Sequence, residues 1–399
     1  MAKRSLPTAS SASEVAGVRT AAAAVNAHHQ PRLLTDEERE LWRRRSAASR
    51  DAKRAALNGE LTPIHDLNVP KLDPYELMPQ AEVRDGAALS LFSGGGGLDL
   101  GFSRAGFTHA ASYELLSDAA ESLRRGLNEG QVFGGAAGNV MGVDWHQWKG
   151  VEVVHGGPPC QPFSVAGRQL GHADERNMWP AFVDCVMKTR PRAFIAENVP
   201  ALASKKFADY VREQIVEPLS RHYTVQQILL RAEDYGVPQG RRRVMFVGFR
   251  RARDSARFTA PRPTHFWGDS ITGRQRTLGA REALGLPDTG YDALSPTIRS
   301  TLTGPRNTTS ILNSVAAQRV FAAMEIWPNG VAPTREAARS FPAENGHFRL
   351  SVPDVAILQG FPEDWPFVGA TYMKLGQIGN AVPPPMGYAV ASSVAAALA

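Results

Sequence analysis

The chain has 399 residues, of which 43% are hydrophobic and 21% are charged, and a formal net charge of +6. No apolar run approaches the roughly 20 residues that a membrane helix needs, and the N-terminus lacks the apolar core of a secretory signal. The two cysteines, Cys160 and Cys185, exclude a disulfide scaffold and a cysteine-based zinc cluster. We expect a cytoplasmic protein with free thiols, no membrane contact and no metal.

Positive charge is concentrated in residues 231–306. This segment holds fourteen arginines, no lysine and seven acidic residues, so it carries a charge of +7. An arginine patch of this kind is typical of proteins that bind a polyanion, although a solvated basic surface would have the same composition. The charge therefore favours nucleic acid as the partner.

Residues 1–85 form an N-terminal extension of different character. A helix is predicted from Thr35 to Asn58, because Thr35 can cap it with Glu38 three residues later and acidic residues crowd its first turn. A proline-broken connector follows it. The extension holds thirteen basic and twelve acidic residues, so it is not a simple phosphate-binding tail, and its function stays open.

From Ala87 onward, short apolar runs alternate with helical patterns. Strands are expected at 87–92, 109–114, 151–157, 193–199, 225–230 and 243–249, and helices at 98–105, 117–127, 177–190 and 207–223. This alternation predicts an α/β domain over 86–250 with a doubly wound, largely parallel sheet. Residues 251–345 predict a smaller, loop-rich domain, and residues 346–399 return to packed structure with helices at 353–362 and 387–399.

A glycine-rich loop, Phe92, Ser93 and Gly94 to Gly97, separates the first strand from the first helix. In a doubly wound sheet this turn lies beside the ligand crevice, but its spacing is not that of a phosphate loop or a strict dinucleotide loop. Glu114 ends the next strand, where a carboxylate can accept hydrogen bonds from ribose hydroxyls. Taken alone, a tight turn and a surface glutamate remain open as alternatives.

A cysteine lies between prolines directly after the strand at 151–157, in Pro159-Cys160-Gln161. Prolines fix the backbone and so aim the side chain, and a thiolate there would be nucleophilic. Cys185, within a predicted helix, fits a buried inert thiol instead.

Further polar residues follow the next strands. The carboxyl ends of parallel strands line one crevice, so Glu197 is expected near Cys160 as a candidate proton donor. Arg241 and Arg243 alternate along an extended segment and would project to one side. They could hold phosphate or stabilise charge that develops on a carbonyl.

Together these motifs resemble the C5-cytosine DNA methyltransferase family, from about Leu89 to Ala399. The motifs that carry the resemblance are Phe92 to Gly97, Glu114, Pro159-Cys160-Gln161, Glu197-Asn198-Val199, Gln239 with Arg241 and Arg243, and Gln377 with Gly379, Asn380 and Val382. Six motifs in the family's order make a chance match negligible.

The resemblance implies a methyltransferase fold that uses S-adenosylmethionine. The residues that it assigns to the cofactor are Phe92, Ser93, Gly94, Gly96, Gly97, Glu114, Asn139 and Asn380. The family usually has aspartate where this chain has Asn139, which still offers an amide oxygen as acceptor. We expect weakened or retuned binding of the adenine, with Asp144 as an alternative acceptor.

The resemblance also implies a mechanism in which Cys160 attacks C6 of a cytosine that has flipped out of the duplex. Glu197 protonates N3, C5 takes the methyl group, and loss of the C5 proton and of Cys160 restores the ring. Arg243 would lie near the cytosine carbonyl, with Arg241 as a second contact. The other residues that it assigns to substrate binding are Pro159, Gln161, Ser164, Asn198 and Gln239.

Residues 251–345 correspond to the family's target-recognition domain, which reads base edges in the major groove of double-stranded DNA. Arg299, Arg306 and Asn307 are its candidate base contacts, although each could contact phosphate alone. The compact size favours a monomeric prokaryotic enzyme of a restriction–modification system, located in the cytoplasm at the nucleoid. Its cognate endonuclease would act on the same site, with no direct contact implied. A tRNA-acting relative, and a DNA- or partner-binding role for residues 1–85, are the alternatives.

Overall fold

The computed structural model describes residues 35–159, 177–268, 273–300, 308–312, 314–341 and 343–399. It divides into two units, Met1–Ala55 and Ala56–Ala399. Helix α2 (Asp36–Leu57) confirms the helix predicted at 35–58. The backbone nitrogen of Thr35 donates to Glu38 (2.8 Å), and that of Glu38 donates to the Thr35 hydroxyl (3.2 Å), which forms the predicted cap.

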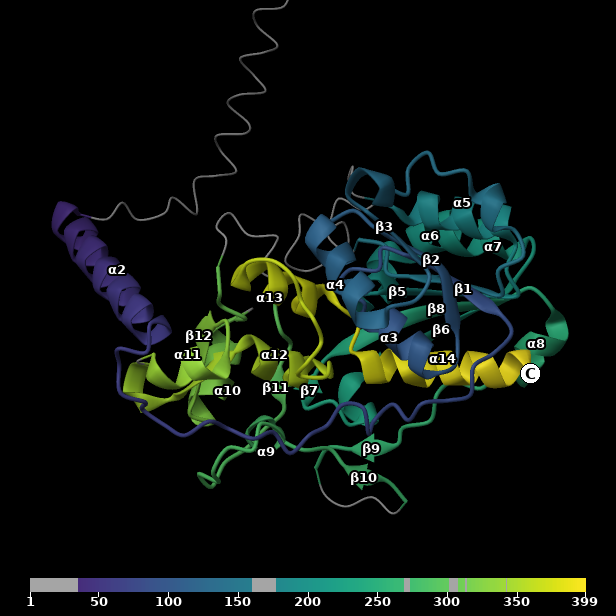
Figure 1. Ribbon diagram of the computed structural model, residues 1–399. Coiled ribbons are helices and arrows are strands. Elements are labelled where there is room, and N and C mark those ends of the chain that lie inside the picture. Colours follow the sequence, from purple (N-terminus) through teal and green to yellow (C-terminus); the bar gives the residue numbers. More distant parts are fainter. Residues whose placement is uncertain (1–34, 160–176, 269–272, 301–307, 313, 342) are drawn as a thin grey trace, which may run out of the picture. The chain divides into compact units, whose positions relative to one another are not determined.

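A seven-stranded sheet in the order β3-β2-β1-β4-β5-β8-β6 forms the centre of the second unit (Figure 1). Its strands are β1 (Ala87–Leu91), β2 (Thr108–Glu114), β3 (Gln131–Gly134), β4 (Val153–Gly156), β5 (Ala193–Asn198), β6 (Thr224–Arg231) and β8 (Arg242–Phe249). The pairs from β3 to β5 are parallel, whereas β8 runs antiparallel to both β5 and β6. This confirms the predicted α/β fold with a largely parallel sheet.

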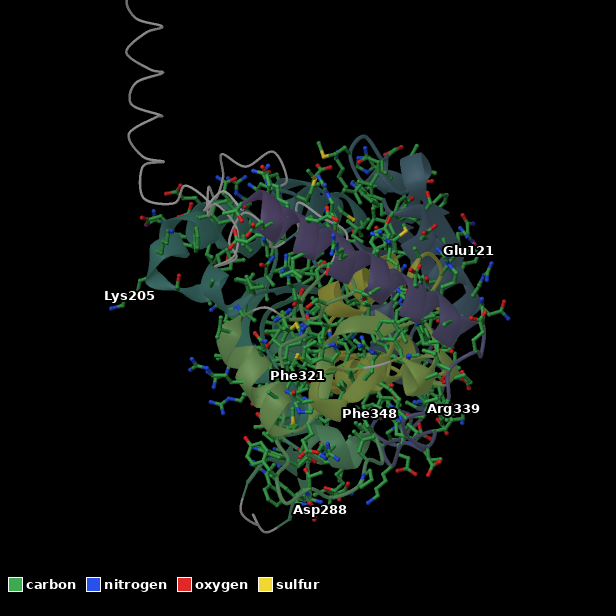
Figure 2. All side chains as sticks on the ribbon, turned by 90° about the vertical axis from the view of Figure 1, so that its left-hand side faces the viewer. Glu121, Lys205, Asp288, Phe321, Arg339 and Phe348 are labelled. Carbon is green, nitrogen blue, oxygen red and sulfur yellow. The ribbon has the colours of Figure 1, made fainter. Side chains whose placement is uncertain are left out.

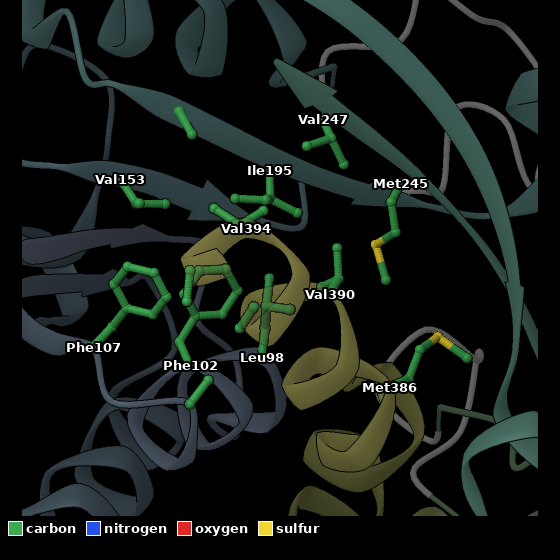
Figure 3. Close-up of a cluster of buried hydrophobic side chains, with 14 of the residues drawn as sticks. Leu98, Phe102, Phe107, Val153, Ile195, Met245, Val247, Met386, Val390 and Val394 are labelled. Carbon is green, nitrogen blue, oxygen red and sulfur yellow. The ribbon is translucent and has the colours of Figure 1, made fainter. Parts of the chain in front are cut away.

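Helices cover both faces of the sheet. Successive residues of a strand point to opposite faces, so each strand packs against both layers of helices. Ala88 packs in one cluster with α3 (Gly97–Arg104) and α14 (Pro384–Leu398), shown in Figure 3. Its neighbour Leu89 packs in a second cluster, on the side of α5 (Trp179–Thr189). Helices α3 and α14 approach so closely that a Cβ at Gly101 would lie 2.4 Å from the backbone nitrogen of Tyr388.

The helix predicted at 207–223 is interrupted. It consists of α6 (Ala208–Val211), a π-helical turn (Arg212–Val216) and α7 (Glu217–Ser220). Pro218 has no backbone N–H and cannot continue a regular hydrogen-bond ladder, which accounts for the irregular turn just before it. Strand β3 and helix α13 (Thr371–Asn380) were not predicted from the sequence.

A third hydrophobic cluster packs short elements from the second half of the chain around Leu350 and Ile357. The elements that the structure describes between residues 239 and 359, apart from β8, are β7 (Gln239–Gly240), α8 (Ala252–Arg257), β9 (His265–Phe266), β10 (Gln275–Arg276), α9 (Ala280–Ala283), β11 (Ser295–Pro296), α10 (Val315–Ala323), β12 (Ile326–Ala332), α11 (Arg335–Ser340), a short 3-10 turn (Glu344–Gly346), β13 (Phe348–Ser351) and α12 (Val352–Gln359). Phe321 belongs to this cluster and Phe348 packs against it; both are labelled among the side chains drawn in Figure 2. Strand β12 lies before the predicted domain boundary at residues 345 and 346, and β13 lies after it. Because the two strands pair with each other, this boundary does not separate two packed units, and the domain limits stay predictions.

Helix α4 (Ser117–Leu127) follows β2 and packs against β2 and β3. Within the described ranges, no helix combines the length and the apolar character that crossing a membrane requires.

Candidate functional site

The glycine loop joins β1 to α3 in a left-handed turn. Phe92, Gly94 and Gly96 have φ values of 56°, 56° and 87°, and the nitrogen of Gly96 donates to the carbonyl of Ser93 (3.0 Å). A Cβ at Gly94 would meet no atom within 4 Å, whereas one at Gly97 would lie 2.2 Å from the carbonyl oxygen of Val382. The loop therefore presents open backbone on one side and packs tightly on the other, as glycine alone allows.

Glu114 ends β2 directly beside this loop. Its Oε2 accepts a hydrogen bond from the nitrogen of Gly94 (2.7 Å), and its Oε1 accepts one from the nitrogen of Leu116 (2.7 Å). The side chain is buried, and this burial raises the pKa of Glu114. The sequence-predicted neighbours Gly94 and Glu114 are thus brought into direct contact.

Asn139 lies near the same end of β2. A Cβ at Gly138 would stand 2.0 Å from the carbonyl oxygen of Glu114, so the two backbones touch. Asn139 is exposed, and its Oδ1 accepts a hydrogen bond from the nitrogen of Met141 (3.0 Å). The amide oxygen of Asn139, which the sequence analysis assigns as the acceptor for the adenine, therefore already accepts a hydrogen bond from the local backbone.

Apolar side chains around Glu114 and Asn139 are left uncovered. Leu115 is 59% exposed, Leu116 48% and Met141 60%. A base and sugar placed here would cover apolar surface and also meet the open backbone of Gly94. The residues present thus fit a nucleoside-containing group such as S-adenosylmethionine.

The loop that leads to Cys160 is held by β5. The Nδ2 of Asn198 donates to the carbonyl oxygen of Pro158 (3.0 Å), and a Cβ at Gly157 would lie 3.0 Å from Oε2 of Glu197. Pro159 is half-buried. Cys160, Gln161 and Ser164 lie outside the described residues, but Gly157, three residues before Cys160, lies beside the predicted proton donor Glu197.

Glu197 forms an ion pair with Arg243, whose Nε lies 2.6 Å from its Oε1. Burial raises the pKa of Glu197, while the positive charges of Arg243 and Arg241 act in the opposite direction. A carboxyl group that keeps its proton at higher pH than usual can act as a general acid. Both predicted arginines therefore influence the one carboxylate that the sequence singled out.

Arg241 is 1% exposed. Its guanidinium donates to the carbonyl oxygens of Ile298 (3.3 Å), Gly379 (2.8 Å) and Ala381 (3.0 Å). It thus ties the start of β8 to the segment after β11 and to the end of α13. Its predicted contact with cytosine stays a prediction; these bonds show what it holds within the protein.

Gln239 is also fully buried. Its Nε2 donates to the carbonyl oxygen of Leu358 (3.0 Å) and to Oε1 of Gln359 (2.8 Å), and its Oε1 accepts from the nitrogen of Ile298 (3.3 Å). These bonds connect β7 with α12, and direct contact with substrate stays a prediction.

Arg299 and Asn380 lie on neighbouring backbone segments. Both are exposed, and a Cβ at Gly379 would stand 2.5 Å from the carbonyl oxygen of Arg299. Arg306 and Asn307, the other candidate base contacts, lie outside the described residues.

Sequence reasoning missed Trp365, which contacts the glycine loop through a hydrogen bond and through its ring. Its indole nitrogen donates to the carbonyl oxygen of Gly95 (2.9 Å), and its ring stands against Gly96 and Gly126. Gln377, also near Gly95, accepts from the hydroxyl of Ser122 (2.7 Å). The signal for Trp365 was a lone tryptophan in a proline-containing stretch, which no local pattern distinguishes from a core residue.

Comparison with known proteins places this geometry in a family. The model of the C-5 cytosine-specific DNA methylases matches residues 87–396. The type II methyltransferase M.NgoMIV of Neisseria gonorrhoeae is 32% identical over 321 residues, which cover 78% of this chain and 97% of that protein. M.NaeI of Lentzea aerocolonigenes is 31% identical over 324 residues, which cover 78% of this chain and 75% of that protein.

A solved structure shows the same fold. It is described as a DNA modification methyltransferase encoded within an E. coli prophage, and it is similar with a TM-score of 0.52 and 22% identity over 79% of this chain and 99% of that one. The family match spans most of the chain, including every element of the site described above. The chain therefore belongs to the C-5 cytosine-specific DNA methylases and is a DNA cytosine-5-methyltransferase.

Proposed function

We propose that this enzyme transfers the methyl group of S-adenosylmethionine to C5 of one cytosine within a short, specific sequence of double-stranded DNA, as the modification enzyme of a restriction–modification system. The observation that carries the proposal is the buried Glu197–Arg243 pair, which lies where Asn198 holds the loop that enters Cys160. The type II names of the two relatives support the biological setting.

The residues of the site divide the chemistry among them. The Cys160 thiolate adds to C6 of a cytosine that has left the base stack, while Glu197 gives a proton to N3 and Arg243 faces the cytosine carbonyl. S-adenosylmethionine, when bound, supplies an electrophilic methyl group. C5 takes this methyl group, and water removes the C5 proton. The bond between Cys160 and C6 then breaks to regenerate the thiolate, and N3 returns its proton to Glu197, which restores the aromatic ring.

Cofactor binding is assigned to the loop of β1 and to the end of β2. Glu114 has both oxygens engaged by backbone nitrogens in the free protein, and each oxygen keeps further lone pairs for ribose hydroxyls. Gly94 leaves its side of the loop open. Asn139 and the exposed apolar side chains beside it would receive the adenine.

Target recognition is assigned to the arginine-rich segment. Its charge of +7 over residues 231–306 provides attraction to phosphates that is independent of sequence. Arg299, Arg306 and Asn307 are the proposed contacts to bases or to phosphates. The enzyme would act as a monomer in the prokaryotic cytoplasm, on the same DNA site as its endonuclease and without contacting it.

The test is methyl transfer from labelled S-adenosylmethionine to mixed-sequence duplex DNA, with transcript RNA in parallel and base-resolution mapping of 5-methylcytosine. We expect methylation at one short recurring DNA motif, none in RNA, and none with Cys160→Ser. Label in RNA alone would contradict the DNA assignment. Transfer by Cys160→Ser at the normal rate would contradict the covalent route.

A further inference from the structure

Three metal-ligating side chains lie together under α3: Asp99, His109 and His155. Their ligand atoms all lie within 4.8 Å of one another. The Nε2 of His109 stands 2.9 Å from Nε2 of His155 and 3.9 Å from Oδ1 of Asp99. All three residues are buried, with exposures of 4% or less, and none takes part in the proposed transfer.

The sheet topology creates this meeting. Strand β1 lies between β2 and β4, with His109 in register with Ala88 and His155 in register with Ser90. Small side chains on the central strand leave room for two imidazoles to reach each other across it. Asp99 reaches the same face from the first turn of α3.

Other side chains hold these groups in orientations suited to a metal ion. Oε1 of Glu129 lies 3.2 Å from Nδ1 of His109, and the Ser112 hydroxyl donates to Oδ1 of Asp99 (3.1 Å). When Nδ1 of His109 carries the proton toward Glu129, its Nε2 turns a lone pair toward Asp99 and His155. A carboxylate on the far nitrogen of the imidazole is the usual arrangement around metal-binding histidines.

Two buried atoms of the group lack a hydrogen-bond partner among the described residues: Oδ2 of Asp99 and Nδ1 of His155. The ring of Phe102 stacks on His155 at a centroid distance of 4.1 Å and covers that imidazole. Burying a carboxylate without a compensating positive charge is costly. A cation would compensate it and accept the Nε2 lone pairs of two neutral imidazoles, and Nδ1 of His155 would then carry that imidazole's proton.

We propose that Asp99, His109 and His155 bind one divalent transition-metal ion, with zinc as the ion to test. Two imidazole nitrogens and one oxygen of Asp99 would provide three donors of the nitrogen and oxygen types that zinc takes, with a fourth position left for water. The two Nε2 atoms now share a hydrogen bond of 2.9 Å, and nitrogens bound tetrahedrally to zinc stand about 3.3 Å apart. Metal binding therefore requires a small widening and a shift of the shared proton from Nε2 to Nδ1 of the same imidazole. The sequence-based expectation of no metal would then be wrong.

The ion would have a structural role. Asp99 belongs to the helix that follows the glycine loop, and the two histidines belong to strands on either side of β1, so the ion would fix α3 to the sheet directly beneath that loop. An ion that binds the native state and not the unfolded chain raises stability by mass action. The proposal does not depend on methyl transfer, and its test uses other measurements.

The experiment uses the full chain without a histidine tag, expressed in zinc-supplemented medium and, separately, in cobalt-supplemented medium. We expect about one metal ion per chain by elemental analysis, visible cobalt bands typical of tetrahedral nitrogen and oxygen ligands, and a melting temperature that falls by ~5 °C after prolonged chelation. His109→Gln and His155→Gln should each lose the metal and the cobalt bands. The matched controls His146→Gln and His222→Gln, which alter exposed histidines, should keep both.

Two results would overturn the proposal. One is wild-type protein that holds far less than one ion per chain and shows neither cobalt bands nor a response of melting temperature to chelation. The other is metal that persists in both His109→Gln and His155→Gln, because the ion would then be bound elsewhere. If a variant fails to fold, the cobalt spectrum of the wild type still decides whether a site with nitrogen and oxygen ligands exists.

Discussion

The indole nitrogen of Trp365 donates a hydrogen bond of 2.9 Å to the carbonyl oxygen of Gly95, a residue 270 positions earlier in the chain. The glycine loop has little side-chain packing of its own, so its shape depends on partners such as this one. Gln377 stands on the same side, 3.1 Å from the position of a Cβ at Gly95. The shape of the glycine loop is therefore set partly by residues in the last fifth of the sequence.

Trp365→Phe should weaken binding of S-adenosylmethionine about fivefold, because a neutral hydrogen bond contributes about 1 kcal/mol and its loss frees the loop. Calorimetric titration measures the change. Trp267→Phe is the matched control, since Trp267 is 41% exposed and should bind normally. Equal affinities for wild type and Trp365→Phe would show that the loop keeps its shape unaided.

Glu114→Ala should weaken cofactor binding more strongly, by tenfold or more, because it removes the acceptor of two backbone nitrogens and the proposed acceptor of the ribose hydroxyls; a hydrogen bond to a charged group contributes ~1.5–3 kcal/mol. The same calorimetric titration applies. An unchanged dissociation constant would refute the role of Glu114 at the cofactor.

Cys160→Ser should abolish methyl transfer while DNA binding stays near normal, because a hydroxyl is a far weaker nucleophile than a thiolate. Cys185 supplies the control: it is fully buried in α5, and burial raises the pKa of its thiol well above the usual value. Cys185→Ser should keep transfer and lose about 1–3 kcal/mol of stability from burying a hydroxyl. Single-turnover assays and thermal melts separate the two effects.

Glu197→Gln should slow single-turnover transfer by roughly 10²–10⁴-fold, the range for loss of a general acid. The protonated carboxyl is the active form, so the wild-type rate should fall as pH rises through the pKa of Glu197. Because burial raises that pKa, the fall should occur at higher pH than for an exposed glutamate. The variant should lack this fall; an identical pH profile would remove Glu197 from the proton transfer.

Arg241→Lys should mainly lower stability, whereas Arg243→Lys should mainly lower the rate of methyl transfer. Arg241 makes three bonds to backbone carbonyls, which lysine cannot reproduce, so we expect a loss of about 2–4 kcal/mol in unfolding free energy. Arg243, paired with Glu197, should affect the transfer rate more than stability. Denaturant unfolding and single-turnover rates give both values, and equal losses of stability would contradict the distinction.

Local sequence patterns were sufficient where an element depends on its own residues. The apolar runs at β1, β4 and β5 predicted buried parallel strands, and their shared direction placed Gly94 and Glu197 at one edge of the sheet. The same reasoning missed α13, because Gly376 and Gly379 resemble loop residues. In the fold, Gly379 serves a close approach to the backbone of Arg299, which only the assembled structure reveals.

The remaining site features depend on contacts between distant segments. Trp365 has no local signal that points to Gly95. His109 and His155 meet only because β1 lies between their strands and carries small side chains there. To predict this contact one must know the order of the strands in the sheet and the size of the side chains on β1. A sequence pattern contains neither.

The packing of α14 on α3 has a consequence for how the enzyme is made. Residues 382–388 touch the backbone of Gly97 and Gly101, so α3 has its native covering only when the C-terminal residues are present. On the ribosome, the surface that carries Leu98 and Phe102 stays uncovered until the residues of α14 have been synthesised. We expect nascent chains that stop before residue 382 to be captured by chaperones and to have no activity, because the residues that cover α3 have not yet been made.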